Sequence, residues 1–403
     1  MKLLSGKTYW DKTLNSEKKF PKLKESIVAE ILIIGGGMSG NLAAHELCKR
    51  GHKVTLIEKN SIAKGSSSAN TGLLQYSSDI MLWELAQNIG EKDAVLFYKM
   101  CLESMNKLTN LNHSLSSETD YISRDSIYYA SDEKDAEKII KEYSYLKKYD
   151  FPVEFLDRET LKKNYAIDKP CALRTWKDAE VNPYKFIRAL VDENVKMGVS
   201  YFENTSIDLD NIIDNKAYTI DGLEIIYDSV ILATGYGKIY NCIKDKARID
   251  RTYAFSAVSS MDEPWRDKVM IWETKMPYIY FRVAEENRII AGGLDEEIQK
   301  VQENETIIYQ KTEQIKNEIQ SLFPDLDLEI DYRWNALFGS SLDGLPFIGR
   351  DPFDFDKYYL LGYEGNGTCY SMAGADILSD LIEGKDNIYA HLLKVERKLK
   401  VEK

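Results

Sequence analysis

Hydrophobic positions follow two different periods along this chain, and each change of period predicts a new element. Short apolar runs at 31–34, 54–57 and 230–233 are typical of buried parallel strands. Apolar residues at helical spacing predict helices over 79–116, interrupted at Gly90, and over 132–149, 157–165, 184–197, 305–322 and 368–382. Ser78 and Asp79 are expected to cap the first of these helices.

Alternating apolar and polar positions predict strands in the rest of the chain. They are expected over 121–130, 172–176, 201–207, 221–226, 227–235, 329–337 and 358–361, with a loop over 178–183 and a strand-rich region over 251–292. In that region Tyr278, Tyr280 and Arg282 share one face of a strand, which forms a hairpin with residues 287–291. The mixture predicts an α/β fold with a second, α+β portion.

The first predicted strand ends in a glycine-rich turn that opens the first helix. Gly35 permits the tight turn, Gly37 lets a pyrophosphate approach the backbone, and Gly40 lets the helix pack close to the strand. The helix N-terminus offers N–H groups and a positive dipole end to phosphates. Glu58 ends the second strand, where an acid accepts hydrogen bonds from ribose hydroxyls. The pattern predicts a dinucleotide-binding unit, and a glycine turn in an ordinary βαβ unit is the alternative.

Further stretches of small residues suit a large ligand. The hydroxyl-rich loop over 61–74 follows Glu58 directly and offers hydroxyls and N–H groups to a pyrophosphate, although a flexible serine linker is the alternative. A strand ends in Ala233, Thr234 and Gly235, where the backbone can pass close to a ligand. Residues 362–368 form a second glycine-rich junction between a strand and a helix, which is another anion-friendly end.

Composition narrows the class of partner for these 403 residues. The net charge of −12 argues against a nucleic-acid partner. The apolar runs have the length of strands, so we expect no transmembrane helix, and residues 1–25 lack the apolar core of a signal peptide. Five scattered cysteines and four histidines without ligand spacing indicate reduced thiols, a cytoplasmic location and no metal site.

The motifs occur in one order that resembles a known flavoprotein family. The glycine turn with Glu58, the loop to Gly72, the strand 230–235, the turn 343–349 and the junction 362–368 resemble the family of D-amino-acid oxidase, glycine oxidase and sarcosine oxidase. An N-terminal arm with Tyr9-Trp10 and the strand with Tyr280-Phe281-Arg282 are most similar to its γ-glutamylputrescine oxidase-like branch. The resemblance implies FAD, bound non-covalently because residues 334–342 hold no cysteine.

The resemblance also implies a domain organisation and a set of cofactor residues. A Rossmann-type FAD-binding domain would be assembled from residues 26–85, 178–246 and 341–390, and an antiparallel-sheet substrate domain from 86–177 and 247–340. An N-terminal arm (1–25) and a C-terminal tail (391–403), expected as a solvated helix or frayed end, would flank them. The residues that match the family's cofactor positions are Gly35, Gly37, Met38, Ser39, Gly40, Glu58, Lys59, Ser66, Ser67, Asn70, Thr71, Gly72, Leu73, Ile207, Ala233, Thr234, Gly235, Gly365, Asn366, Gly367 and Thr368.

The implied reaction is oxidation of the C–N bond of a small amine or amino acid by hydride transfer to flavin N5, followed by hydrolysis of the imine. Arg282 suits the grip of a substrate carboxylate, with a structural ion pair as the alternative. Tyr278 and Tyr280 would wall the pocket or serve as plain packing. Lys275 would lie over the flavin and assist oxygen, or it is a solvated turn lysine. Oxygen or another acceptor would take the electrons.

Other functions remain open at the level of sequence. An FAD-dependent 2-hydroxy-acid dehydrogenase on the same fold would use the same residues, and a catalytically degenerate flavin-binding subunit would keep only the cofactor motifs. An NAD-linked dehydrogenase is disfavoured because it has no need of the second glycine junction near Gly365. The sequence does not indicate the substrate's identity or the oligomeric state.

Overall fold

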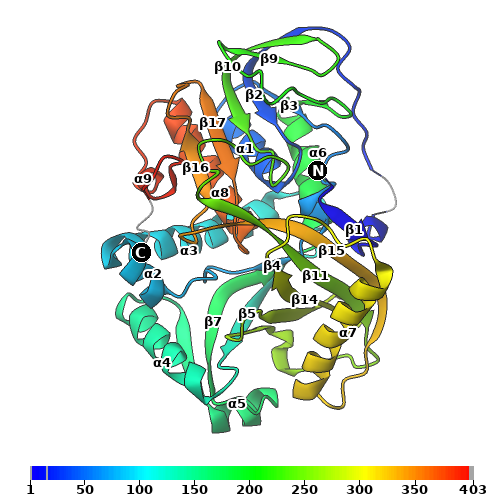
Figure 1. Ribbon diagram of the computed structural model, residues 1–403, viewed down its shortest axis with the longest axis vertical. Coiled ribbons are helices and arrows are strands. Elements are labelled where there is room, and N and C mark those ends of the chain that lie inside the picture. The colour runs from blue at the N-terminus through cyan, green and yellow to red at the C-terminus, as the bar shows by residue number, and fades with distance from the viewer. Residues whose placement is uncertain (1, 15–16, 399–403) are drawn as a thin grey trace.

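The computed structural model describes residues 2–14 and 17–398, which contain two β-sheets, one above the other in Figure 1. The smaller sheet has seven strands in the order β16-β17-β10-β2-β3-β8, with β9 beside β10. Its inner strands pair in parallel, whereas β9 and β16 run antiparallel to their neighbours. The bounds are β2 Ile27–Ile34, β3 Val54–Ile57, β8 Ser200–Phe202, β9 Lys216–Tyr218, β10 Glu224–Leu232, β16 Phe347–Arg350 and β17 Lys357–Leu361.

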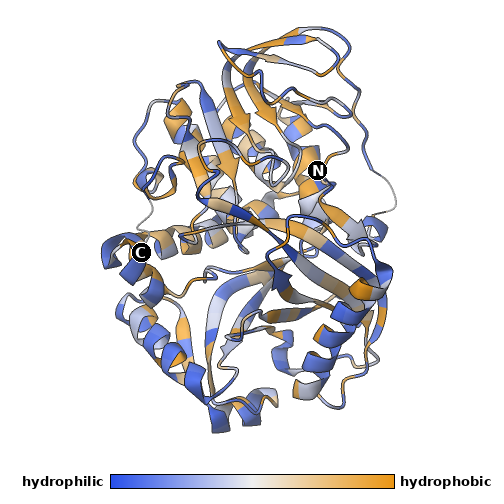
Figure 2. Ribbon diagram, viewed as in Figure 1, coloured by the Kyte–Doolittle hydropathy of each residue, from blue (hydrophilic) through white to orange (hydrophobic). Residues whose placement is uncertain are grey.

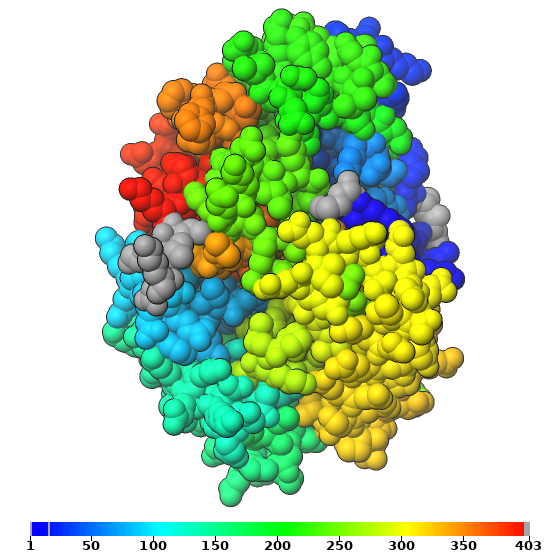
Figure 3. All heavy atoms as spheres, viewed as in Figure 1, coloured from blue at the N-terminus to red at the C-terminus, as the bar shows by residue number. Residues whose placement is uncertain are grey.

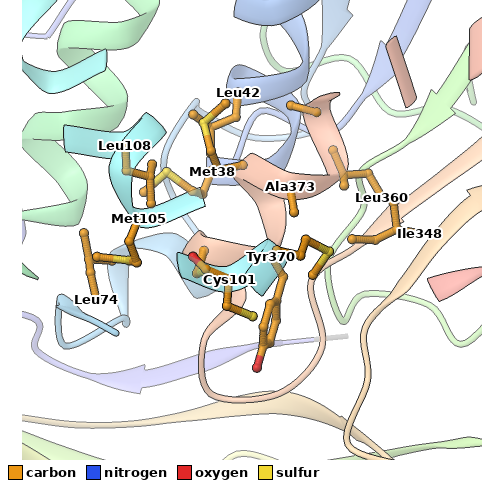
Figure 4. Close-up of a cluster of buried hydrophobic side chains, with 14 of the residues drawn as sticks. Met38, Leu42, Leu74, Cys101, Met105, Leu108, Ile348, Leu360, Tyr370 and Ala373 are labelled. Atoms are coloured by element: carbon orange, nitrogen blue, oxygen red, sulfur yellow. The ribbon is translucent and has the colours of Figure 1, made fainter. Parts of the chain in front are cut away.

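Helices cover the smaller sheet and form the main core. Helix α1 (Met38–Lys49) packs against α8 (Gly367–Ile382) and α6 (Pro183–Lys196), and the long α3 (Glu91–Ser114) packs against α8. Figure 4 shows side chains of α1, α3 and α8 meeting in one cluster, with Leu42, Met105 and Tyr370 among them. Each fully buried leucine in such a cluster contributes about 1.5–3 kcal/mol to stability. This packing fixes the start of α1 relative to the start of α8.

The larger sheet has ten strands in the order β1-β15-β11-β14-β13-β12-β5-β7-β4, with β6 beside β7. All its pairings are antiparallel except that between β12 and β5. The bounds are β1 Leu4–Gly6, β4 Leu73–Leu74, β5 Ile122–Tyr129, β6 Val153–Asp157, β7 Cys171–Glu180, β11 Ala247–Val258, β12 Met270–Glu273, β13 Ile279–Ala284, β14 Arg288–Glu296 and β15 Glu329–Ser341.

The remaining helices lie mainly on the larger sheet's half of the molecule. They are α2 Leu82–Ile89, α4 Glu133–Lys148, α5 Arg158–Tyr165, α7 Glu305–Leu322 and α9 Ala390–Leu393, with short 3-10 turns at Trp10–Lys12, Ser66–Ser68, Arg266–Lys268 and Glu285–Asn287. Helix α7 buries Ile308, Thr312, Ile315 and Ile319, which recur at helical spacing on one face. Figure 2 shows the contrast between the hydrophobic strands β2 and β10 and the largely hydrophilic α4. On the face drawn in Figure 3, residues around 300 (yellow) cover much of the lower half of the molecule, and green segments form its upper end.

Most predicted elements are present, and several boundaries differ. The helix over 305–322 and the break at Gly90 are confirmed. The strand expected over 172–176 runs on to Glu180, so the loop predicted from 178 was wrong, and the strand expected over 201–207 ends at Phe202. Residues 224–232 form one strand in place of two. The N-terminal arm contributes β1, which pairs with β15, and β4 also belongs to the larger sheet.

Two local expectations at helix ends were wrong for physical reasons. Ser78 and Asp79 do not cap α2; its first N–H groups, those of Leu82 and Trp83, donate to the carboxylate of Glu142 on α4. The C-terminal tail is a helix only as far as Leu393, and Arg397 is buried and paired with Asp343. Residues 399–403 of the predicted tail lie outside the described residues. Among the described helices, none combines the length and apolar character needed to cross a membrane.

Candidate active site

A cavity of about 540 Å³ lies where the carboxyl ends of β2, β3 and β10 face strands of the larger sheet. Ile34, Ile57 and Ala233 line it from the parallel sheet, and Tyr280 and Asp295 line it from β13 and β14. Ligands of open α/β sheets bind outside the carboxyl ends of the strands, because loops and helix N-termini converge there. The cavity therefore occupies the ligand position expected for this sheet.

The glycine turn after β2 has the geometry that its sequence predicted. Gly35 has a φ of +120°, and a Cβ there would lie 2.2 Å from the carbonyl oxygen of Ala233. A Cβ on Gly40 would lie 1.9 Å from the carbonyl oxygen of Gly35, so Gly40 serves the close packing of α1 on β2 and does not line the cavity. The amide of Asn41 donates to the carbonyls of Gly36 and Gly37 and holds the turn, a role that the motif alone did not reveal.

Two helices point their N-termini at the cavity. Neither Gly37, the N-cap of α1, nor Asn366, the N-cap of α8, caps its helix through a side-chain hydrogen bond. The hydroxyls of Ser39 and Ser371, 2.8 Å apart, join the first turns of the two helices. The N–H of Met38 donates to the hydroxyl of Ser67 at 3.1 Å, which ties the serine loop to α1. Together the helix ends form a positive region suited to an anion such as a pyrophosphate.

Glu58 lines the cavity beside the glycine turn. Its carboxylate accepts hydrogen bonds from the N–H groups of Gly36 and Asn60, each at 2.8 Å. Burial raises the pKa of Glu58, while these two N–H groups act in the opposite direction. Glu58 therefore shapes the glycine turn, in addition to lying beside Thr205 and Ile207 in the cavity wall.

Most of the residues expected at the cofactor lie around this one cavity. The lining includes Gly35, Gly37, Met38, Ser39, Glu58, Lys59, Ser66, Ser67, Asn70, Thr71, Leu73, Ile207, Ala233, Thr234, Gly235, Gly365, Asn366, Gly367 and Thr368, together with Tyr278 and Tyr280. Gly40, Gly72, Arg282 and Lys275 are not part of it. Gly72 has a φ of +79°, and a Cβ there would lie 2.1 Å from the carbonyl oxygen of Val181, so this glycine is needed for close backbone packing.

The structure corrects the expectation that Arg282 grips a substrate carboxylate. The guanidinium is 2 % exposed and donates to the carbonyls of Thr71, Val181 and Val283. It also lies 3.6 Å from the buried carboxylate of Glu180. Arg282 shares the strand face of Tyr278 and Tyr280, as the alternation predicted, but the strand carries it beyond the cavity. The structural ion pair is the arrangement observed.

Lys275 also lies outside the cavity. Its ammonium group is 2.9 Å from the carboxylate of Glu318 on α7, and its side chain is 47 % exposed. Lys275 is therefore a partly solvated lysine paired with Glu318, and it does not line the cavity.

The part of the cavity against the larger sheet is aromatic. Trp272, Tyr278, Tyr280 and Phe338 line it, and the Trp272 ring stacks on that of Tyr128 with centroids 3.7 Å apart. Burial, the first cause in each case, raises the pKa values of both lining tyrosines, so both hydroxyls stay neutral near pH 7. This wall excludes water and offers ring faces and hydroxyl groups to a ligand.

Three carboxyl groups border the same part of the cavity. Asp79 accepts a hydrogen bond from the N–H of Gly365 at 2.7 Å and from the Tyr278 hydroxyl at 3.3 Å. Burial raises the pKa of Asp295 to about 7 and, with the nearby Asp79, that of Glu364 to about 8. Burial also raises the pKa of Asp79. Buried acids whose pKa values lie close to neutrality are typical of functional sites.

Sequence reasoning missed several cavity residues for different reasons. Asp79 was assigned to a helix cap, and Gln75, Trp272 and Asp295 stand in no motif. Glu364 lies inside the second glycine-rich junction, so its place there was the one sequence feature that could have indicated an acid in the cavity. The others come together only because β12, β14 and the loop before α2 converge in the fold.

The parallel sheet, the glycine turn and the cavity at the carboxyl ends of the strands define a dinucleotide-binding protein of the flavoenzyme type. Residues 30–381 match the model of the DAO family, whose description is FAD dependent oxidoreductase. The chain belongs to the DAO family of FAD-dependent oxidoreductases, as its sequence motifs predicted.

Individual relatives are similar across most of this chain. A protein of Bacillus subtilis (strain 168) with the provisional name Rieske 2Fe-2S iron-sulfur protein YhfW is 24% identical over 97% of this chain and 75% of its own length. The γ-glutamylputrescine oxidoreductase of Escherichia coli (strain K12) is 22% identical over 94% of this chain and 89% of its own length. The crystal structure of glycine oxidase from Geobacillus kaustophilus superimposes with a TM-score of 0.78 at 19% identity, covering 92% of this chain and 99% of that one. This likeness confirms the fold.

The cavity fits FAD on observations of its own. One lining contains Glu58 and Ile207, the N-termini of two helices, and Tyr278 and Trp272. Gly37 lines the cavity, and a Cβ on it would lie only 2.9 Å from the Ser67 hydroxyl, so glycine keeps the backbone accessible where a phosphate would approach. Among the described residues, neither cysteine nor histidine lines the cavity, which agrees with the expectation of non-covalent FAD.

Proposed function

We propose that this chain oxidises the carbon–nitrogen bond of a small amine or amino acid, with FAD held non-covalently along the cavity. The observation that carries the proposal is the continuity of the cavity, whose lining includes both the glycine turn and a group of aromatic and acidic side chains. The first provides anchoring for a dinucleotide. The second provides a water-poor site for a small polar molecule.

The cofactor assignment follows the lining of the cavity. Glu58 and Ile207 would hold the adenosine, the N–H groups at the start of α1 and the Ser67 hydroxyl would hold phosphate, and the N-terminus of α8 would stabilise negative charge on the redox-active ring. Gly40 and Gly72 support the cofactor indirectly, through the packing of α1 and of the loop beside Val181.

When bound, FAD supplies the acceptor of a hydride from the carbon next to nitrogen. The chain's own residues orient the amine, exclude water and take its proton. We assign proton acceptance to Oδ1 of Asp295, a buried atom with no hydrogen-bond partner among the described residues. An ammonium R–CH₂–NH₃⁺ thus loses a proton and then a hydride to give R–CH=NH₂⁺, and water converts this to an aldehyde and ammonium. The two electrons pass on to oxygen or another acceptor.

The test is an anaerobic titration of the purified, FAD-loaded protein with amines, D- and L-amino acids and N-methyl glycines, followed by visible absorbance. Bleaching of the flavin by one class supports the proposal, and readmission of air separates an oxidase from a dehydrogenase by the rate at which colour returns. Bleaching by 2-hydroxy acids alone would contradict it. A flavin that no amine or amino acid bleaches would favour a catalytically degenerate flavoprotein.

A further inference from the structure

Within the part of the chain that the structure describes, three of the four acidic residues that line the cavity act on one tyrosine hydroxyl, whereas the fourth, Glu58, belongs to the part that we assign to the cofactor. Asp79, Asp295 and Glu364 come from the loop before α2, from β14 and from the loop before α8, and all line the cavity. Burial is the main cause of the raised pKa of the Tyr278 hydroxyl, and the negative charge of each of these three acids raises it further. All three acids therefore lie within electrostatic reach of that oxygen. Among the described residues they form no cluster tight enough to hold a metal ion. An organic cation is the ligand that such a spread of carboxyl groups suits.

Positive groups of the cavity wall belong to its other regions or have partners elsewhere. Lys2 pairs with Glu303, Lys64 pairs with Asp11, and Lys59 lies near Gly237, in the part that we assign to the cofactor. Arg282 is committed to backbone carbonyls and to Glu180. A substrate carboxylate beside Tyr278 would therefore lie close to carboxyl groups. Among the described residues, no cationic side chain lines this part of the cavity to offset their repulsion.

Arg248 is a cation whose charge lowers the pKa of Asp295. Its guanidinium donates to Asp250 and Ser340 and pairs with Glu297, outside the cavity lining. Because these acceptors already occupy it, Arg248 does not supply a carboxylate clamp either.

Buried polar atoms in this region lack partners. Oδ1 of Asp295 and Nε2 of Gln75 are buried with no hydrogen-bond partner among the described residues, and both side chains line the cavity. Gln75 is only 8 % exposed. Leaving such groups unpaired is unfavourable by about 1–3 kcal/mol each, so the site is built to receive a polar ligand. Beside them, the rings of Trp272, Tyr278 and Tyr280 offer faces that attract a cation.

We propose that the cavity selects an alkyl amine cation that carries no carboxylate, with Asp79, Asp295 and Glu364 as its counter-charge and Trp272, Tyr278 and Tyr280 as its walls. The inference rests on the proposed function, because it names the substrate class of the same site. It excludes α-amino acids as good substrates, since their carboxylate would lie beside these acids.

The decisive experiment measures binding without turnover. The FAD-loaded protein is titrated with butyltrimethylammonium, which has no N–H to lose, and separately with hexanoate, while the visible spectrum of the bound flavin is recorded. We expect a saturable spectral change with the cation and none with the anion. A change with hexanoate alone, with both alike, or with neither would overturn the inference.

A second arm separates this inference from the proposed function. Anaerobic butylamine is expected to bleach the flavin at least about tenfold faster than 2-aminopentanoate of the same chain length. Faster bleaching by the amino acid would leave amine oxidation intact and overturn the inference. If neither these two compounds nor any other amine or amino acid bleaches the flavin, the proposed function fails, while the binding titration still decides the charge preference.

Matched variants locate the counter-charge. Asp295→Asn keeps the size of the side chain and removes its charge, so we expect affinity for butyltrimethylammonium to fall about tenfold. Glu297→Gln removes a charge two positions away on an exposed side chain that pairs with Arg248, and it should leave the affinity unchanged. Equal effects of the two substitutions, or none from Asp295→Asn, would overturn the role of this cluster. The wild-type comparison of cation and anion remains decisive if Asp295→Asn fails to retain FAD.

Discussion

The carboxylate of Asp79 accepts a hydrogen bond from the backbone N–H of Gly365 at 2.7 Å, although 286 positions separate the two residues. This contact joins the loop before α2 to the glycine junction before α8 at the edge of the cavity. Asp79, which belongs to no recognised sequence motif, thus lies beside Gly365, which belongs to the second glycine-rich junction.

Gly365→Ala should disturb this contact selectively. A Cβ at Gly365 would lie 2.8 Å from both carboxylate oxygens of Asp79, so the acid must move. We expect about tenfold weaker binding of butyltrimethylammonium in the FAD-loaded fraction of the variant. Spectral titration gives the affinity, and the ratio of visible to ultraviolet absorbance gives the FAD content. Unchanged affinity in a fully loaded variant would show that the position of Asp79 does not matter for the cation.

The binding of a permanent cation should strengthen as pH rises through 7 to 8. Burial raises the pKa of Asp295 to about 7, facing Asp79, Asp250 and Arg248, and raises that of Glu364 to about 8, facing Asp79 and Asp343. A cation favours the ionised acids, so protons must leave when it binds below these pKa values, and affinity is lost as pH falls.

The measurement is the dissociation constant of butyltrimethylammonium between pH 6 and 9, since this ligand does not titrate. We expect it to fall by about tenfold across that range. Asp295→Asn should flatten the part of the profile near pH 7. A flat profile in the wild-type protein would contradict the participation of either acid.

Arg282→Ala should lower stability more than it alters substrate preference. Among the described residues, the substitution leaves Glu180 with Arg124 as its one ion-pair partner, and it removes the donors to Thr71 and Val181, so we expect a loss of about 3–5 kcal/mol. Thermal unfolding measures this loss. The double variant Arg282→Ala, Glu180→Gln should recover part of it, because no buried charge is then left behind. A selective rise in KM for carboxylate-bearing substrates, with stability intact, would restore the clamp hypothesis.

Glu58→Ala should weaken FAD retention without unfolding the chain. The N–H groups of Gly36 and Asn60 would lose their acceptor, so the turn that carries the phosphate-binding backbone would loosen. A drop of about tenfold in FAD affinity is expected, measured by reconstitution of the apoprotein and followed by flavin fluorescence. Circular dichroism controls for folding. Full cofactor occupancy at purification would count against the assignment of this acid to the cofactor site.

Local patterns in the sequence were sufficient for the cofactor half of the site and insufficient for the substrate half. The glycines from Gly35 to Gly40 and the acid Glu58 lie within one βαβ unit, where spacing alone fixes their relation. Asp79 and Asp295 become neighbours of Tyr278 only through the pairing order of the larger sheet and the path of the loop before α2. For Arg282, the strand face was predicted correctly but the role was not. Its buried partner Glu180 lies on a strand distant in sequence, so the sequence pattern did not reveal the ion pair.

Glu142 gives a prediction that is independent of the cavity. Its carboxylate accepts hydrogen bonds from the N–H groups of Leu82 at 2.9 Å and Trp83 at 3.2 Å, and thereby caps α2 from α4. The side chain is 3 % exposed, and burial raises its pKa from 4.5 to about 7 even though the two N–H groups oppose the shift.

The sign of the effect on stability follows from proton uptake. Between pH 4.5 and 7 the folded chain holds a proton on Glu142 that the unfolded chain has released, so the free energy of unfolding falls as pH rises through this window. A shift of this size corresponds to roughly 3 kcal/mol, present below the window and lost above it. Glu142→Gln cannot titrate, so its thermal midpoint should depend less on pH between 5 and 8 than that of the wild type, even if its overall stability is lower. Glu137→Gln, on the exposed face of the same helix, should keep the wild-type profile. Parallel profiles for Glu142→Gln and the wild type would show that this carboxyl group is ionised in the folded protein and that the cap, with its N–H donors, outweighs burial.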